Sequence, residues 1–259
     1  MKTFLLSLFI ATVGFAQAVQ AAVWNGTVDI SWYNPRDTMF FISTAEQLAG
    51  LSHLSRNVNF SGRTIRLTAD IWLNDTTAWQ TWNIFTPANK WIPIRNFSGV
   101  FDGNNHFIYG MYINSGQRGM IEKAGFIGYM DNRHAVVKNL ALSHFFIQHN
   151  GKYAGGIVGH ICCGSVINSA VNGIIIGNRY VGGIVGYAED ENGIISGNLV
   201  FAKITGRRDV GGLIGRIHRK PVVNNQFSGR ILINRKESRN LFGRIGLRGR
   251  NGVFGNAFI

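Results

Sequence analysis

The chain has 259 residues, of which 46% are hydrophobic and 15% are charged, and it contains 33 glycines but only 4 prolines. These proportions exclude a disordered chain, which carries fewer apolar residues, and a collagen, which needs glycine at every third position. The 26 Lys and Arg residues outnumber the 13 Asp and Glu residues, so the net charge is +13. What remains is a basic, glycine-rich globular or repeat protein with a hydrophobic core.

The N-terminal segment has the pattern of a secretory signal peptide. Lys2 precedes an apolar stretch from Phe4 to Phe15, and small residues lead up to Ala21. This stretch is short of the roughly 20 residues that span a bilayer. We therefore expect residues 1–21 to be removed and the mature protein to be secreted or held at the cell surface, with the periplasm as an alternative and no transmembrane segment.

Residues 22–96 are predicted to form a β-rich cap with one short helix. Ser43 and Glu46 have the spacing of a capping box, which predicts a helix from about Thr44 to Leu54. A helix at the open end of a sheet would prevent edge-to-edge pairing. The six tryptophans all lie in this part of the chain, and we expect them in the core, with a sugar-stacking surface as the alternative. They are Trp24, Trp32, Trp72, Trp79, Trp82 and Trp91.

Residues 97–259 contain a repeat with a period of about 28 residues. A Gly-rich segment, such as Gly182 to Tyr187, recurs in four close copies and one degenerate copy. Its closing glycines are Gly128, Gly159, Gly186, Gly215 and Gly243, and each interval between them stays close to one period. Each period holds three short segments rich in Ile and Val and bounded by Gly and Asn, which leaves no room for a long helix. This pattern predicts an all-β solenoid with one coil per period.

An asparagine recurs in each period between the Gly-rich segments. The five positions are Asn139, Asn168, Asn198, Asn225 and Asn256. Asparagine tolerates the left-handed backbone conformation at a corner and can also hydrogen-bond to the backbone. We expect these residues to be structural and to stack as a ladder from coil to coil, with ligand contact as the alternative.

The repeats resemble those of the GLUG family, named for a Gly-Leu-any-Gly core. The matching segments are Gly-Phe-Ile-Gly, Gly-Ile-Val-Gly and Gly-Leu-Ile-Gly, and the lead-in from Ser43 to Ala49 and from Phe97 to His106 also fits. The resemblance covers about residues 38–230. It implies a right-handed parallel β-helix of the kind found in bacterial adhesin-like surface proteins and in non-catalytic regions of some immunoglobulin A proteases. It implies no catalytic residues.

The two cysteines, Cys162 and Cys163, are adjacent. Neighbouring side chains on a strand point to opposite faces, so a disulfide between them would be strained, and we expect structural or free thiols. An intermolecular bridge is the alternative in an oxidising compartment. Without a Cys-x-x-Cys or paired-histidine spacing, the sequence predicts no metal site and no cofactor.

Some polysaccharide lyases and glycosidases also have the parallel β-helix fold, so the acidic residues are candidates for a catalytic pair. A glycosidase requires two carboxylates roughly 5 to 9.5 Å apart. Asp102 and Asp131, which are about one period apart in the sequence, are the nearest candidates for such a pair. The run Glu189 to Glu191 is a candidate for calcium or, more often, a solvated turn. The seven histidines show no metal or nucleophile spacing, and we assign no catalytic residue.

The strongest functional signal is the basic C-terminal quarter. Residues 201–259 contain thirteen basic and two acidic side chains, a net charge of +11. The position after the closing glycine holds Tyr129, His160 and Tyr187 in the earlier coils and Arg216 and Arg244 in the later ones, so the two arginines are predicted to stack. Arginine suits bidentate contact with sulfate, phosphate or carboxylate groups. The predicted binding residues are Arg207, Arg208, Arg216, Arg219, Lys220, Arg244, Arg248 and Arg250.

These features predict a non-catalytic, adhesin-like protein that binds an anionic glycan, lipopolysaccharide or host surface ligand, with no nucleic acid as partner. The alternatives are a carbohydrate-active enzyme on the same scaffold and a structural or assembly component of the cell surface. A solvated basic end that keeps solenoids from stacking is the alternative for the C-terminal charge.

Overall fold

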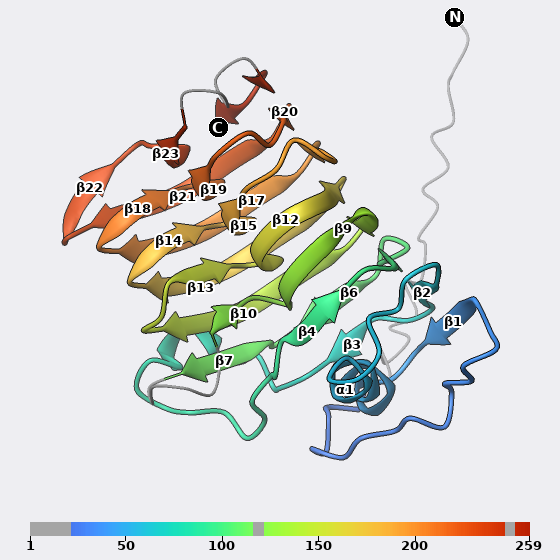
Figure 1. Ribbon diagram of the computed structural model, residues 1–259. Coiled ribbons are helices and arrows are strands. Elements are labelled where there is room, and N and C mark those ends of the chain that lie inside the picture. Colours follow the sequence, from blue (N-terminus) through green and yellow to red (C-terminus); the bar gives the residue numbers. More distant parts are fainter. Residues whose placement is uncertain (1–21, 116–121, 247–251) are drawn as a thin grey trace, which may run out of the picture.

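A computed structural model describes residues 22–115, 122–246 and 252–259 (Figure 1). The predicted signal peptide, residues 1–21, lies outside the described residues, as do Arg248 and Arg250. Figure 1 shows the strands stacked in sequence order from the N-terminal end to the C-terminal end.

The described strands form three sheets whose pairings are parallel except for one. The largest sheet contains β1 (Met39–Ile42), β2 (Thr64–Leu67), β4 (Ile94–Phe97), β5 (Val100–Asp102), β9 (Ile127–Lys138), β12 (Val158–Ile167), β15 (Val185–Ala188), β16 (Ile195–Ser196), β19 (Ile214–Ile217), β20 (Val222–Val223), β23 (Phe242–Ile245) and β24 (Val253–Phe254). The second sheet contains β3 (Ile71–Trp72), β6 (Phe107–Tyr109), β7 (Tyr112–Ser115), β10 (Ala141–His149), β13 (Ala170–Gly177), β17 (Leu199–Gly206), β21 (Gln226–Ile233), β22 (Lys236–Ser238) and β25 (Ala257–Phe258). The third sheet contains β8 (Lys123–Ala124), β11 (Tyr153–Gly155), β14 (Arg179–Gly182) and β18 (Arg208–Gly211). The antiparallel pair is β21 with β22.

Equivalent residues of successive coils stack in register. Val158 pairs with Ile127 on one side and with Val185 on the other, and Val185 pairs with Ile214. All four side chains are completely buried. Each coil thus buries its inward-facing aliphatic residues against the coils above and below, and the predicted all-β parallel β-helix is confirmed.

The N-terminal end is covered by α1 (Ala45–Leu54), the only α-helix among the described residues. Its predicted range is confirmed, but the cap lies one residue later than expected. The hydroxyl of Thr44 accepts the Gln47 backbone N–H at 3.2 Å, and the Gln47 side chain accepts the Ser43 N–H at 2.9 Å. The capping pair is therefore Thr44 with Gln47, because the chain turns one residue after Ser43.

The parallel ladder begins upstream of residue 97. Strand β1 pairs with β2, and β2 pairs with β5, both in parallel. The first strands of the segment expected to be a cap therefore continue the largest sheet. A short 3₁₀ helix, η1 (Trp79–Thr81), lies in the same segment. Of the tryptophans, Trp82 and Trp91 are buried, and the other four are half-buried.

The asparagine ladder exists, but two of its predicted members occupy a different position. The Asn198 Oδ1 atom accepts the Ser169 N–H at 3.0 Å, and the Asn225 Oδ1 atom accepts both the backbone N–H and the side-chain amide of Asn198. Asn256 repeats this contact with Asn225. Asn139 and Asn168 instead adopt positive φ, at 53° and 49°, one residue before the ladder. They occupy the position that Gly197 and Gly255 fill in later coils, so their assignment to the ladder was wrong by one residue.

Candidate functional site

The closing glycines bring strands of the largest sheet and of the four-stranded sheet into close backbone contact. A Cβ atom on Gly186 would lie 2.5 Å from the carbonyl oxygen of Gly159 and 2.7 Å from that of Tyr180. A Cβ atom on Gly215 would lie 2.4 Å from the carbonyl carbon of Tyr180. Only glycine permits such a close approach of backbones. The largest sheet and the four-stranded sheet therefore touch along a seam, where their outward side chains meet.

Five rings meet along this seam and form an aromatic column. Its members are Tyr129, His160 and Tyr187 from the largest sheet and Tyr153 and Tyr180 from the four-stranded sheet. The His160 ring centroid lies 4.9 Å from that of Tyr129 and 5.0 Å from those of Tyr153 and Tyr187. The Tyr180 and Tyr187 centroids are 5.4 Å apart. Since most of these rings stack face to face, the column offers hydroxyl and imidazole edges to a ligand rather than a free ring face.

Two arginines lie against the column in its later coils. Arg216 is in register with Tyr187, and its guanidinium carbon lies 5.4 Å from the Tyr180 centroid and 5.5 Å from that of Tyr187. Arg216 also donates a 2.9 Å hydrogen bond to the Tyr180 hydroxyl. Arg179 lies 4.4 Å from the same Tyr180 centroid, with the Asp209 carboxylate 3.4 Å away. A guanidinium fixed by such contacts loses less conformational entropy when it binds an anion.

Two further arginines extend these contacts along the solenoid. Arg244 is in register with Arg216, which confirms that the two stack in adjacent coils. Arg208 is in register with Arg179 on the four-stranded sheet. Arg208 and Arg244 are exposed. Among the described residues no carboxylate lies within 4.0 Å of Arg208, Arg216 or Arg244, so their charges are available to a ligand. We call Arg179, Arg208, Arg216 and Arg244 the arginine group.

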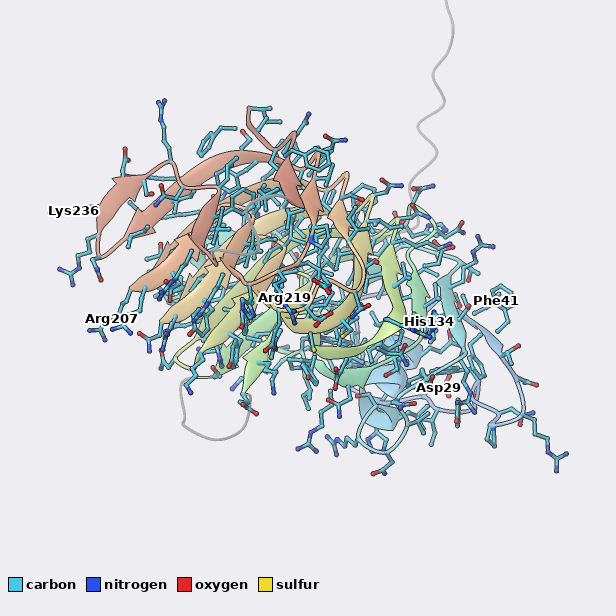
Figure 2. The ribbon with its side chains drawn as sticks, turned by 45° about the horizontal axis from the view of Figure 1, so that its top comes forward. Asp29, Phe41, His134, Arg207, Arg219 and Lys236 are labelled. Atoms are coloured by element: carbon cyan, nitrogen blue, oxygen red, sulfur yellow. The ribbon has the colours of Figure 1, made fainter. Side chains whose placement is uncertain are left out.

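The remaining predicted binding residues are placed differently. Arg207 is exposed beside Arg208. Arg219 is half-buried and paired with Asp190 at 3.1 Å, and Figure 2 shows it well apart from Arg207. The assignment of Lys220 to a binding surface was wrong, because its side chain is fully buried. The chain turns inward there, and the ammonium group donates to the carbonyl oxygen of Asn192.

The two carboxylates considered for catalysis are not paired. Strand β9 is long, and its first part pairs with β4 while its last part pairs with β5. Asp102 is therefore in register with Lys138, at 3.6 Å, and not with Asp131. Burial raises the pKa of Asp102, but hydrogen bonds from Asn104 and Asn139 and the charges of Lys138 and Arg66 outweigh it and hold the pKa below its usual value. Asp102 and Asp131 form no two-carboxylate site.

The acidic run from Glu189 to Glu191 is divided between two partners. The Glu189 carboxylate contacts the His160 Nε2 atom at 3.0 Å, whereas Asp190 is paired with Arg219. Burial lowers the pKa of His160, and the Glu189 contact opposes that effect only in part. His160 is therefore neutral at neutral pH. Burial also raises the pKa of Tyr129, Tyr153 and Tyr187, so their hydroxyls remain protonated.

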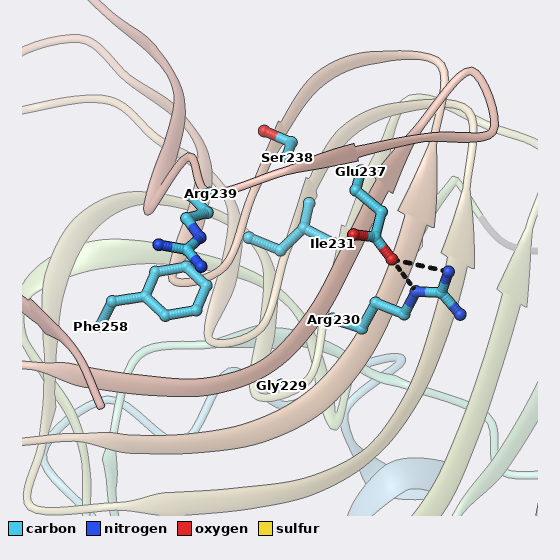
Figure 3. A pocket seen from close by; sticks show the side chains of 7 residues that line it. All are labelled: Gly229, Arg230, Ile231, Glu237, Ser238, Arg239 and Phe258. Atoms are coloured by element: carbon cyan, nitrogen blue, oxygen red, sulfur yellow. Dashed lines mark hydrogen bonds and ion pairs between the residues drawn. The ribbon is translucent and has the colours of Figure 1, made fainter.

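An open pocket lies at the C-terminal end of the solenoid (Figure 3). Its volume is about 480 Å³, and it is bounded by the β21–β22 hairpin and by β25. Arg230 and Glu237 form an ion pair across the hairpin at 2.7 Å. The lining residues are Gly229, Arg230, Ile231, Glu237, Ser238, Arg239 and Phe258. Because the Glu237 carboxylate lines this pocket and pairs with Arg230, the pocket is a weaker candidate for anion binding than the arginine group.

Three residues of the site were not found from the sequence. Arg179, Tyr153 and Tyr180 come from the four-stranded sheet, just before the first glycine of each Gly-rich segment. The signal was present, because Tyr153 and Tyr180 occupy the same position relative to Gly155 and Gly182. The repeat therefore continues upstream of the first glycine to this tyrosine position.

Comparison with known proteins gives one partial similarity. A stretch of 168 residues is 28% identical to Halomucin of Haloquadratum walsbyi, covering 64% of this chain but only 2% of Halomucin. No family model matches the chain. No solved structure matches it. Within the described residues no helix is long and apolar enough to cross a membrane.

Proposed function

We propose that the protein binds an anionic polysaccharide outside the cytoplasm, through the arginine group and the adjoining edge of the aromatic column. The observation that carries this proposal is the fixed position of Arg216, which is held by one hydroxyl and two rings and has no carboxylate partner among the described residues. Guanidinium donors held in this way suit sulfate and carboxylate groups.

The geometry supports an extended ligand rather than a compact one. The stacked positions from Tyr129 to Arg244 cover five coils. With strands about 4.8 Å apart, four steps between coils span about 19 Å. A polysaccharide chain lying along the solenoid axis would meet tyrosine hydroxyls first and guanidinium groups later.

Two features of the sequence agree with such a role. The signal-peptide pattern supports a secreted or surface location. The resemblance to GLUG-repeat proteins supports adhesin-like binding without catalysis. An acidic glycan of the cell's own surface and one of a host surface both present sulfate or carboxylate groups.

The test is binding of the purified mature protein to heparin, with uncharged dextran as the comparison ligand. Replacing Arg216 and Arg244 together by glutamine should weaken heparin binding at least about tenfold, since a hydrogen bond to a charged group contributes about 1.5 to 3 kcal/mol. The matched control replaces Arg36 and Arg56 together by glutamine, which removes the same two charges at exposed positions near the N-terminal end. Equal binding to dextran, or equal weakening by the control, would contradict the proposal.

Self-association of the mature protein without heparin binding would instead favour an assembly role.

A further inference from the structure

The two adjacent thiols point to the same side of the strand. The pairing of β12 with β9 changes register between Ile161 and Cys163 and again between Cys163 and Ser165. Such irregularities interrupt the alternation of side chains along a strand. As a result Cys162 and Cys163 are both half-buried, and their Sγ atoms lie 3.5 Å apart. The expectation that they face opposite sides was wrong for this reason.

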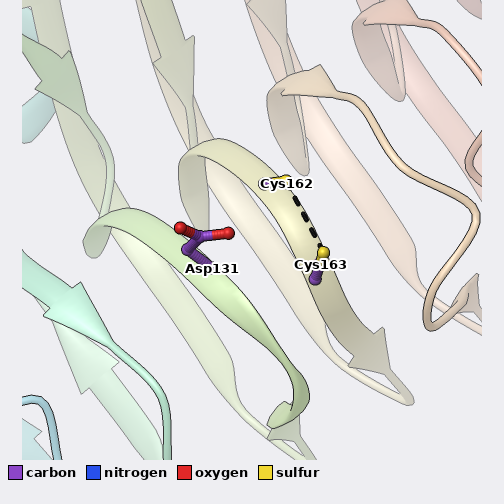
Figure 4. Close-up of side chains that lie close together, drawn as sticks. All are labelled: Asp131, Cys162 and Cys163. Atoms are coloured by element: carbon purple, nitrogen blue, oxygen red, sulfur yellow. Dashed lines mark hydrogen bonds between the residues drawn. The ribbon is translucent and has the colours of Figure 1, made fainter.

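A third ligand comes from the preceding coil. Asp131 on β9 is in register with Cys163. One carboxylate oxygen of Asp131 and the two sulfur atoms all lie within 4.8 Å of one another. Figure 4 shows the three side chains, with Asp131 on the strand next to the one that holds the two cysteines. Sequence spacing could not reveal this group, because Asp131 lies a full repeat before Cys162 and reaches it only through the stacking of coils.

We propose that Asp131, Cys162 and Cys163 bind a thiophilic divalent metal ion such as Zn²⁺. With Zn–S bonds of about 2.3 Å, tetrahedral coordination places two sulfur ligands about 3.8 Å apart, close to the separation found here. The carboxylate supplies a third donor and leaves a fourth position open. That combination of three protein ligands with an open position is typical of zinc sites that hold water or an outside ligand.

The surroundings of the three donors favour a metal site over a disulfide. Both cysteines are free thiols, and a disulfide would require the sulfur atoms to approach to about 2.05 Å. The nearby Asp131 carboxylate has no role in a disulfide, whereas it adds a third ligand to a metal site. Asp131 is exposed, so an ion can reach the group from solvent. All three donors sit on paired strands, which hold ligands more rigidly than loops do.

The experiment uses the reduced mature protein and Co²⁺ as a spectroscopic substitute for Zn²⁺. We expect uptake of one Co²⁺ per chain, with thiolate-to-cobalt charge-transfer absorption and the intense visible bands of tetrahedral coordination. Competition with Zn²⁺ should abolish both signals. Cys162→Ser and Cys163→Ser should each remove the charge-transfer band or reduce it by about half.

Asp131→Asn should weaken Zn²⁺ binding by at least the roughly 10- to 100-fold that the loss of an outer-shell partner costs. Its matched control is Asp37→Asn, an exposed carboxylate at the other end of the chain, which should leave affinity unchanged. Thermal unfolding of each variant separates loss of ligands from loss of fold. Co²⁺ uptake without a charge-transfer band, or no uptake by fully reduced protein, would overturn the proposal. An Asp131→Asn variant with unchanged affinity would also overturn it.

Discussion

At the residue scale, Lys220 was predicted to bind a ligand, but its charged group has a structural role. Its side chain is fully buried, and its ammonium group donates to backbone carbonyl oxygens of neighbouring coils at Asn192 and Gly164. Burial lowers the pKa of Lys220 from 10.5 to about 8. The folded protein therefore releases this proton at a lower pH than the unfolded chain does.

This difference predicts a pH-dependent stability. Between pH 8 and 10.5 the unfolded chain still binds the Lys220 proton while the folded protein has lost it, so stability should rise with pH across this window. The lowering of the pKa from 10.5 to about 8 corresponds to about 3 kcal/mol. Urea unfolding of the wild type and of Lys220→Met at several pH values checks it. The free-energy difference between the two should shift in favour of the wild type above pH 8, and parallel profiles would contradict the prediction.

Two features of the chain lie one residue away from their predicted positions. The repeat aligns Asn139 and Asn168 with the ladder asparagines, but the ladder position in their coils holds Leu140 and Ser169. At this corner of each coil, a residue with positive φ comes directly before the ladder residue, whose side chain points inward. Asparagine is suited to both positions. The same offset separates Ser43 from the true cap, Thr44. Register at this precision depends on backbone geometry that composition does not reveal.

At the scale of strands, the closing glycines determine where sheets touch. Gly186→Ala would place a Cβ atom 2.5 Å from a backbone oxygen, whereas Gly128→Ala, at the same repeat position in an earlier coil, would meet its nearest atom at 3.2 Å. Overpacking typically costs about 1 to 3 kcal/mol, and rigid backbone cannot move aside. We therefore expect Gly186→Ala to be destabilised by about 3 kcal/mol and Gly128→Ala by less than about 1 kcal/mol.

Chemical denaturation of the two glycine variants, read by circular dichroism, tests this expectation. An equal loss of stability in both would mean that the seam relaxes around the added methyl group. The sequence predicted this element well, because a glycine repeated at constant spacing indicates a constant steric requirement. It predicted the stacking of Arg216 and Arg244 for the same reason, but not the contribution of Tyr180 and Arg179, since these two residues lie just before the repeated glycine motif.

At the scale of the molecule, the two ends of the solenoid differ in how well they are covered. Helix α1 covers the N-terminal end with six buried residues, among them Leu48 and Leu51. At the C-terminal end β23 is only partly buried, and Phe254 and Phe258 are 61% and 40% exposed. The antiparallel strand β22 pairs with β21 and helps to protect that edge from other chains.

This asymmetry predicts the order in which the solenoid opens. In a stacked array each coil is stabilised mainly by its neighbours, so the coil with the fewest buried contacts should open first. We expect amide hydrogen exchange to be fastest in β23 to β25 and slowest in β12 to β17, where residues such as Val158 and Val185 are completely buried. Exchange measured peptide by peptide with mass spectrometry gives this order. Heparin should slow exchange in β18, β19 and β23 if the arginine group binds it, but leave β1 and β2 unchanged. Uniform protection of all coils in the free protein would instead indicate a single cooperative unit, because opening of the end coil would then require opening of the whole stack.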